Sequence, residues 1–137
     1  MFARVCSPDA VIISLDLLWS QFGGGYSEWR TPLYKSFAVH NQKMYLVPEN
    51  SHTLSALDKV ETILKGRKLD FLFIDGDHTY EGAKKDFGMY SRLVGKGGIV
   101  AFHDICVHPT HPPQKKTGCE VSKFWHQIKK GTRTPKY

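Results

Sequence analysis

Four short apolar runs, rich in β-branched and aromatic residues, constrain the fold of this chain more than any other feature. Each run is continuous rather than alternating between apolar and polar residues. Continuous runs of this length are typical of parallel strands that are covered on both faces. The runs predict β-strands at residues 11–16, 43–48, 69–75 and 98–103.

Helical patterns lie between and after these runs. Ser51 can cap a helix whose apolar residues recur every three or four positions: Leu54, Leu57, Val60 and Leu64. Further helices are predicted at Thr79–Val94, at Val121–Ile128 and at Arg30–Val39, the last beginning at Pro32. Strands that alternate with helices predict an α/β fold, a three-layer αβα sandwich around a mostly parallel sheet with right-handed crossovers.

Length and composition predict one ordinary globular domain over residues 1–137, with 41% hydrophobic and 23% charged residues. No apolar run approaches the ~18 residues that a membrane-spanning helix needs. The opening residues MFARVCSPDA lack the apolar core of a signal peptide. The cysteines at 6, 106 and 119 form no disulfide framework, so we expect a cytoplasmic protein in a reducing compartment.

The net charge of +6 is spread over small basic groups along the chain. These groups fall on the polar sides of predicted helices or in loops. Nucleic-acid binding would require basic side chains gathered on one face, with aromatic side chains among them. The sequence therefore predicts no nucleic-acid partner and no membrane partner.

Polar residues come directly after every predicted strand. The segment FLFIDGDHTYEG, residues 71–82, runs from a buried strand directly into Asp75 and His78. In open α/β sheets, ligands bind beyond the carboxyl ends of the strands. We therefore expect one cleft to be lined by the residues at these strand ends, which are Asp16, Asn50, Asp75, His78, His103 and Asp104.

The acids among these residues have structural and chemical interpretations. Asp77 either caps the next helix or has a chemical role. Gly76 is expected for its backbone conformation, which is less restricted than that of other residues. Asp16 taken alone is compatible with a turn. Asp75 and Asp104 at neighbouring strand ends would repel each other unless a cation lies between them. Such a pair can supply part of the octahedral shell of a divalent ion such as Mg²⁺.

Residues 69–105, LDFLFIDGDHTYEGAKKDFGMYSRLVGKGGIVAFHDI, resemble the fourth strand, fourth helix and fifth strand of class I S-adenosylmethionine-dependent methyltransferases. The resemblance is to the branch of cephalosporin hydroxylase-like and rhamnosyl O-methyltransferase-like proteins. Residues 118–125, GCEVSKFW, also fit that branch. The resemblance implies a Rossmann-like methyltransferase fold, S-adenosylmethionine as cofactor and a small-molecule substrate.

The resemblance also implies roles for individual residues. Asp16 would accept hydrogen bonds from the ribose hydroxyls of the cofactor, and Asn50 and Ser51 would border the adenine. Asp75 would lie near the reacting methyl group and be the first metal ligand. This residue therefore counts among the cofactor-binding, catalytic and metal-binding candidates.

His103 and Asp104 fall where related metal-dependent methyltransferases have a pair of acidic or amide ligands. A histidine at the first of these positions departs from that pattern and bears on the identity of the metal. His78 can orient or deprotonate an acceptor hydroxyl, because its unperturbed pKa lies near neutrality. A core or capping histidine is the alternative interpretation of His78.

Two other groups of residues are candidate ligand sites. Cys106, His108, His111 and Cys119 can in principle bind zinc, but their spacing fits no common zinc signature. The prolines among them favour a loop that covers the cleft. The glycines at 23–25 resemble a phosphate-binding loop. No strong helix start comes after them, so a flexible loop at the active site is the favoured interpretation.

The resemblance predicts that elements of the family are missing. The family's first strand, with a Gly-rich turn for the methionine part of the cofactor, should precede Asp16 by roughly 20 residues. Only 15 residues precede Asp16, and the family's C-terminal strands have no counterpart after residue 130. The chain then resembles a methyltransferase core that is trimmed at both ends.

Loss of a central strand has structural consequences. Residues 11–16 would pair with residues 69–75, or another chain would supply the missing pairing, because unpaired backbone groups are costly when buried. We therefore expect a homodimer and weak cofactor binding by this chain alone. Two candidate functions result: a metal-assisted O-methyltransferase that acts on a hydroxyl of a sugar or secondary metabolite, or a non-catalytic remnant that binds itself or a partner.

Overall fold

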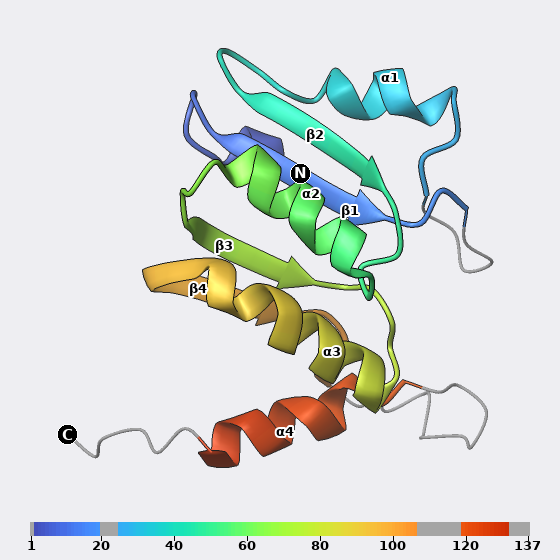
Figure 1. Cartoon of the computed structure of the whole chain (residues 1–137), viewed down its shortest axis with the longest axis vertical. Coiled ribbons are helices and arrows are strands. Elements are labelled where there is room, and N and C mark those ends of the chain that lie inside the picture. Colours follow the sequence, from blue (N-terminus) through green and yellow to red (C-terminus); the bar gives the residue numbers. More distant parts are fainter. Residues whose placement is uncertain (1, 20–24, 107–118, 132–137) are drawn as a thin grey trace. The chain divides into compact units, whose positions relative to one another are not determined.

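The computed structural model describes residues 2–19, 25–106 and 119–131. Contacts divide the chain into two compact units, residues 1–66 and residues 67–137, which we call unit 1 and unit 2. Each unit contains two strands, a helix that joins them and a second helix (Figure 1). The units are described separately below, and the expectation of a single domain stays a prediction.

Unit 1 is built on two parallel strands. Its elements are a short 3-10 helix at Phe2–Arg4, β1 at Val11–Asp16, α1 at Arg30–Lys35, β2 at Lys43–Pro48 and α2 at Leu54–Leu64. The register of β1 and β2 runs without interruption from the pair Val11 and Lys43 to the pair Asp16 and Pro48. Both strands have the bounds that the apolar runs predict.

The helices of unit 1 differ from the prediction at their ends. Thr53, not Ser51, is the N-cap of α2, because the Thr53 hydroxyl accepts the Ala56 N–H at 3.1 Å. Helix α1 contains Pro32 in its first turn rather than at its start, and it ends at Lys35 instead of Val39. The reason is a tighter turn, in which the Phe37 N–H donates to the carbonyl of Tyr34.

Unit 2 repeats this order of elements. It consists of β3 at Leu69–Ile74, α3 at Tyr80–Tyr90, a 3-10 turn at Ser91–Leu93, β4 at Val94–Phe102 and α4 at Val121–Gly131. Strands β3 and β4 are parallel, and Ile74 pairs with Phe102 at their carboxyl ends. The predicted strands at 69–75 and 98–103 are therefore present.

The start of β4 was predicted wrongly. The helix before it ends at Tyr90 rather than Val94, and Val94 already pairs with Leu69. The next pair is Phe71 with Ile99, so the glycine-rich segment between Val94 and Ile99 bulges out of the ladder. Glycine permits this path because Gly97 has a φ of 85°, in the left-handed region.

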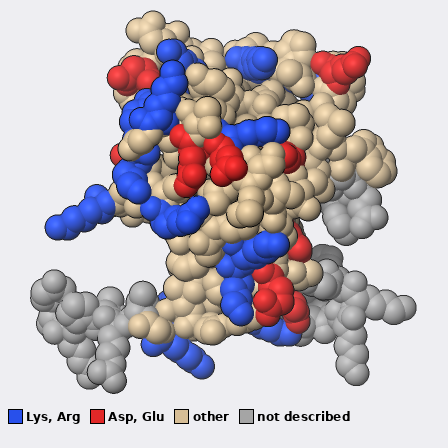
Figure 2. Space-filling view, viewed as in Figure 1, with Lys and Arg blue, Asp and Glu red and all other residues tan. Residues whose placement is uncertain are grey.

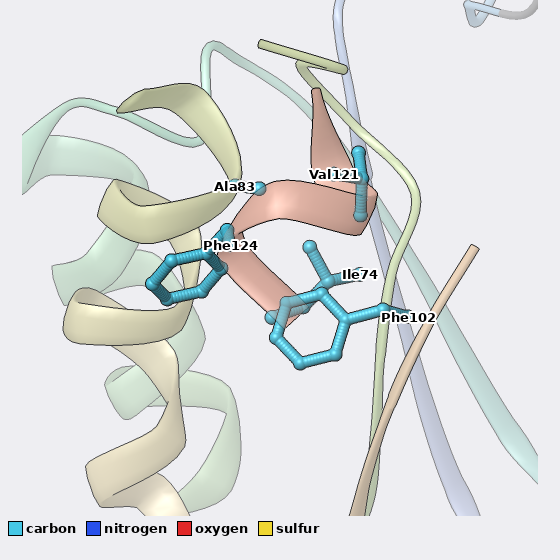
Figure 3. Packing of buried hydrophobic residues seen from close by; sticks show 5 residues of the cluster. All are labelled: Ile74, Ala83, Phe102, Val121 and Phe124. Carbon is cyan, nitrogen blue, oxygen red and sulfur yellow. The ribbon is translucent and has the colours of Figure 1, made fainter. Parts of the chain in front are cut away.

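The core of unit 2 lies between its strands and its two long helices. Every second residue of a strand points to the same face, and Ile74 and Phe102 on that face contact the helices. They pack against Ala83 of α3 and against Val121 and Phe124 of α4 (Figure 3). Aromatic rings around Phe124 lie edge to face with centroids 5.8–5.9 Å apart: Tyr80, Phe87 and Phe102.

The opposite face of the β3–β4 pair also carries large apolar side chains. Phe71 and Phe73 stack with ring centroids 6.4 Å apart, and Ile99 is the register partner of Phe71. These three side chains are 43%, 38% and 60% exposed. The mixed α/β architecture with parallel strands is confirmed. The three-layer arrangement, and the pairing of residues 11–16 with residues 69–75, concern how the units are placed and stay predictions.

Candidate functional site

Four predicted site residues come together at the carboxyl ends of β3 and β4 in unit 2. Asp75 comes after the last residue of β3, and His103 and Asp104 come after the last residue of β4. The His103 N–H donates to the carbonyl of Ile74 at 3.0 Å, which extends the ladder by one bond. The parallel register therefore delivers both strand ends to the same place. We call Asp75, His78, His103 and Asp104 the strand-end cluster.

Each imidazole of the cluster lies between two carboxylates. His78 Nε2 lies 3.3 Å from Asp75 Oδ1, and His78 Nδ1 lies 3.2 Å from Asp104 Oδ2. His103 Nδ1 lies 3.1 Å from Asp75 Oδ1 and 3.1 Å from Asp104 Oδ1. Asp75 and Asp104 thus share His103 Nδ1 as a contact, and the expectation that one ion or water bridges the two carboxylates stays a prediction.

The local backbone explains why Asp104 turns toward the cluster. Asp104 has a φ of 52°, in the left-handed region, which aspartate tolerates better than most residues. This conformation turns the chain away two residues after β4 ends at Phe102. The two Asp104 oxygens then face different rings, Oδ1 toward His103 and Oδ2 toward His78.

The segment that carries Asp75 and His78 is fixed by the start of α3. The Thr79 hydroxyl accepts the Gly82 N–H at 3.0 Å, and Asp77 accepts the Thr79 N–H at 2.9 Å. Thr79 is therefore the N-cap, and the interpretation of Asp77 as the cap is wrong. A Cβ at Gly82 would lie 2.2 Å from Asp77 Cγ, so only glycine allows this approach.

Helix α4 is joined to the same segment. The Glu120 N–H donates to the carbonyl of His78 at 2.7 Å. Hydrogen bonds from Lys123 and from the Tyr80 N–H, together with the Lys123 charge, hold the pKa of the Glu120 carboxyl below its ordinary value. Glu120 thus links the start of α4 to the start of α3, next to the cluster, and sequence reasoning did not identify this residue.

The donor atoms of the cluster suit a cation. All four side chains are 39–54% exposed, so a ligand can reach them. Asp75, His78 and His103 each offer one ligand atom, and these atoms lie within 4.8 Å of one another. The carboxylates of the cluster suit Mg²⁺ or Mn²⁺, and its imidazoles add nitrogen ligands of the kind that other divalent ions of the first transition row prefer. The structure brings Asp75 and His103 within reach of one ion together with His78, whereas Asp104 groups with His78 and Cys119. The predicted ligand set of Asp75, His103 and Asp104 therefore stays a prediction.

A proton is the other positive charge that this arrangement can take. A neutral imidazole donates from one nitrogen, whereas a protonated imidazole donates from both. Both nitrogens of His78 face carboxylates. A positive charge that forms on the ring would therefore lie beside carboxylates, which is the arrangement that assists a general base.

The predicted cofactor residues Asp16, Asn50 and Ser51 lie in unit 1, at the carboxyl ends of β1 and β2. The carboxylate of Asp16 accepts the Leu17 N–H and the Gly25 N–H, each at 2.8 Å. Asn50 accepts the His52 N–H at 2.9 Å. In the structure the side chains of Asp16 and Asn50 therefore organise the loops after their strands. A common cleft with the strand-end cluster concerns the placement of both units and stays a prediction.

Tyr26 is a second residue that sequence reasoning missed. It is buried, and its hydroxyl donates to Ser14 Oγ at 2.6 Å. Burial raises the pKa of Tyr26 to about 12, opposed by the Ser14 hydrogen bond and assisted by the Asp16 charge. Tyr26 therefore anchors the end of the loop that Asp16 begins. An aromatic residue directly after three glycines was the available signal.

Unit 1 also contains two open hollows. One of about 430 Å³ lies between the loop after β1, helix α1 and strand β2, where Leu18, Tyr26 and Pro32 contribute to its wall. The other, of about 560 Å³, lies between β2 and α2. Asp16, Asn50 and Ser51 do not line either hollow.

The remaining expectations concern loops and surface charge. His108, His111, Gly23 and Gly24 lie outside the described residues, so the loop expected to cover the cleft and the glycine loop expected at the active site stay predictions. Figure 2 shows one face on which Lys and Arg side chains have Asp and Glu side chains among them. The absence of a nucleic-acid partner is still a prediction. Among the described residues, no helix combines the length and apolar character that crossing a membrane requires.

Residues 5–105 match a family described as a methyltransferase domain. This chain belongs to that methyltransferase family. The matched segment contains every element from β1 to β4 together with the strand-end cluster, and it ends at Ile105. A methyltransferase domain implies S-adenosylmethionine as the methyl donor.

A relative is similar to part of the chain and carries no assigned function. An uncharacterized protein of Acanthamoeba polyphaga mimivirus is 34% identical over 68 residues, which cover 50% of this chain and 30% of that protein. The aligned region is thus less than a third of the length of the viral relative. No solved structure matches the chain.

Proposed function

We propose that this methyltransferase domain transfers a methyl group to a hydroxyl of a small molecule, with the assistance of a divalent cation. The strand-end cluster carries the proposal, because it joins candidate cation ligands to a candidate base at the carboxyl ends of β3 and β4. The likeness of residues 69–105 to cephalosporin hydroxylase-like and rhamnosyl O-methyltransferase-like proteins favours a sugar or a secondary metabolite as acceptor.

Methyl transfer makes limited demands on the protein. The acceptor oxygen must be held in line with the donor and must lose its proton. S-adenosylmethionine supplies the methyl group, and a bound divalent cation would lower the pKa of the acceptor hydroxyl and fix its direction. The remaining tasks, orientation and proton removal, fall to the side chains of the cluster.

His78 is the proposed base. It accepts the proton of the acceptor hydroxyl on the ring nitrogen at which the hydroxyl replaces a carboxylate contact, and the other ring N–H donates to the second acid. The carboxylates of Asp75 and Asp104 lie 3.3 Å and 3.2 Å from the two nitrogens, so they stabilise the charge that proton transfer creates. Asp75, His103 and Asp104 would hold the cation.

The cofactor would bind through unit 1. Asp16 would accept hydrogen bonds from the ribose hydroxyls, and Asn50 and Ser51 would border the adenine. The hydrogen bonds of Asp16 are compatible with this role. Each of its oxygens accepts one backbone N–H, and a carboxylate oxygen has a second lone pair that can accept another donor.

Cation binding tests the proposed site directly. The full chain is titrated with Mn²⁺, and the bound ion is followed by electron paramagnetic resonance. We expect Asp75→Asn to lose most of the binding of the parent. Asp70→Asn is the matched control, because Asp70 is an exposed acid at the other end of the same strand. Equal Mn²⁺ binding by Asp75→Asn and the parent would contradict the proposal.

The second candidate function is a non-catalytic module that self-associates. The exposed apolar residues Phe71, Phe73 and Ile99 favour it, because a second copy could cover them. Light scattering and calorimetry with S-adenosylmethionine separate the two candidates. A dimer with little cofactor heat supports the module, whereas a monomer with micromolar cofactor affinity supports the enzyme.

A further inference from the structure

A second group of candidate ligands lies on the other side of His78. One ring nitrogen of His78, a carboxylate oxygen of Asp104 and the Sγ of Cys119 lie within 4.8 Å of one another. Cys119 is exposed and comes just before α4, outside the segment that matches the methyltransferase family. We propose that these three side chains form a separate, sulfur-containing site for a thiophilic divalent ion such as Zn²⁺.

The chemistry of the donors distinguishes this site from the proposed catalytic one. A thiolate, an imidazole and a carboxylate are all zinc ligands in proteins, and three protein ligands leave one position of a tetrahedral ion open. The thiolate selects soft or borderline ions, whereas Mg²⁺ and Mn²⁺ prefer oxygen ligands. Asp75 and His103 with His78 offer only oxygen and nitrogen.

The two ligand sets use different atoms of the residues they share. His78 directs Nδ1 toward Asp104 and Nε2 toward Asp75. Asp104 directs Oδ2 toward His78 and Oδ1 toward His103. An ion held by His78, Asp104 and Cys119 would replace the contact between His78 Nδ1 and Asp104 Oδ2. It would leave the contacts of Asp75 with His78 Nε2 and His103 in place, but it would prevent His78 from acting as the base while it is bound.

The backbone around Cys119 is held next to His78. The adjacent Glu120 N–H donates to the His78 carbonyl at 2.7 Å. The carboxylate of Glu120 accepts hydrogen bonds from Lys123 and from the Tyr80 N–H. This pair of connections fixes the start of α4 relative to the start of α3, so that the thiol is kept near the imidazole.

Cobalt substitution tests the site, because Co²⁺ bound to a thiolate gives a sulfur-to-metal charge-transfer band. The full chain is titrated with Co²⁺ in buffer that contains a phosphine reductant. The reductant keeps the thiols reduced without competing strongly for the ion. We expect the parent to develop this band, and added Zn²⁺ to remove it. Cys119→Ser should abolish the band.

Matched controls identify the thiol. Cys6→Ser and Cys106→Ser should both keep the charge-transfer band, since neither cysteine belongs to the proposed ligand set. Asp75→Asn should also keep it, because Asp75 faces the other nitrogen of His78. No band in the parent, or a band that survives in Cys119→Ser, would overturn the proposal. Neither result would depend on whether the proposed methyltransferase site is correct.

Discussion

The two units build the same order of strand, helix, strand and helix, yet they use the acids at their strand ends differently. In unit 1, Asp16 accepts two backbone N–H groups of its own loop. In unit 2, Asp75 and Asp104 contact imidazoles that other segments supply. The same residue type at the end of a parallel strand therefore organises a loop in one unit and builds a candidate binding site in the other.

The difference arises from the segment that comes after each strand. After β1 the chain continues into a loop whose N–H groups are available to Asp16, so local partners satisfy the carboxylate. After β3 the chain begins α3 within a few residues, and the Thr79 cap and the Asp77 hydrogen bond satisfy the backbone at that point. The carboxylate of Asp75 is thus left to imidazoles, one of which arrives from the end of β4.

The largest expected effect concerns the core that supports the strand-end cluster. Phe124→Ala removes a buried ring from between α3, α4 and the strands, and should cost about 3–5 kcal/mol of unfolding free energy in urea. Hydrogen exchange should then rise more in the amides of Leu69–Ile74 than in those of Val11–Asp16. Leu57→Ala in α2 is the matched change in unit 1, and it should reverse the order. Equal effects of each substitution on both strands would show that the two units open together.

A smaller effect is expected at the start of α3. Gly82→Ala places a Cβ against Asp77 and should cost about 1–3 kcal/mol, measured by thermal or urea unfolding. Gly88→Ala in the same helix meets no atom within 4 Å and should stabilise the chain by about 0.5–1 kcal/mol. If both substitutions have the same sign, the close approach of Asp77 to α3 does not determine the path of the segment.

A third test replaces Asp16, which organises a loop in unit 1, and Asp75, which belongs to the strand-end cluster of unit 2. Asp16→Ala should cost about 1–2 kcal/mol, because the N–H groups of Leu17 and Gly25 lose a charged acceptor, and should leave Mn²⁺ binding unchanged. Asp75→Asn should change the unfolding free energy little and should lose Mn²⁺ binding. Urea unfolding and paramagnetic resonance on both variants measure the two properties. A loss of Mn²⁺ binding in Asp16→Ala would remove the distinction between the units.

A further effect is a pH dependence that belongs to unit 1 and appears only at alkaline pH. Burial raises the pKa of Tyr26 to about 12 in the folded chain, while an unfolded tyrosine titrates near 10. The folded state therefore keeps this proton when the unfolded state loses it, so stability falls as pH rises from about 10 to about 12. Unfolding of the parent and of Tyr26→Phe across that range measures the contribution. If the parent and Tyr26→Phe lose stability equally over this pH range, Tyr26 makes no such contribution.

The amino-acid sequence was sufficient to predict most of the elements and the segment that carries the site. Continuous apolar runs predicted the bounds of β1 and β2 without error, because each run is short and is followed by polar or turn residues that mark its end. The resemblance of residues 69–105 pointed to the methyltransferase family that the comparison shows. The strand-end rule also selected Asp75, His78, His103 and Asp104, since parallel strands bring their carboxyl ends to one edge.

Other features depended on hydrogen bonds and pairings that the sequence pattern does not encode. The choice of Thr53 over Ser51, and of Thr79 over Asp77, was a local matter of which side chain reaches the helix N–H three residues later. The other features depended on contacts between distant segments. The glycine bulge in β4 depended on pairing with Leu69, which no local pattern encodes. Cys119 joined His78 because Glu120 connects α4 to the start of α3, more than 40 residues earlier in the chain. Contacts between distant segments cannot be obtained from periodicity, because periodicity reports only which face each segment buries.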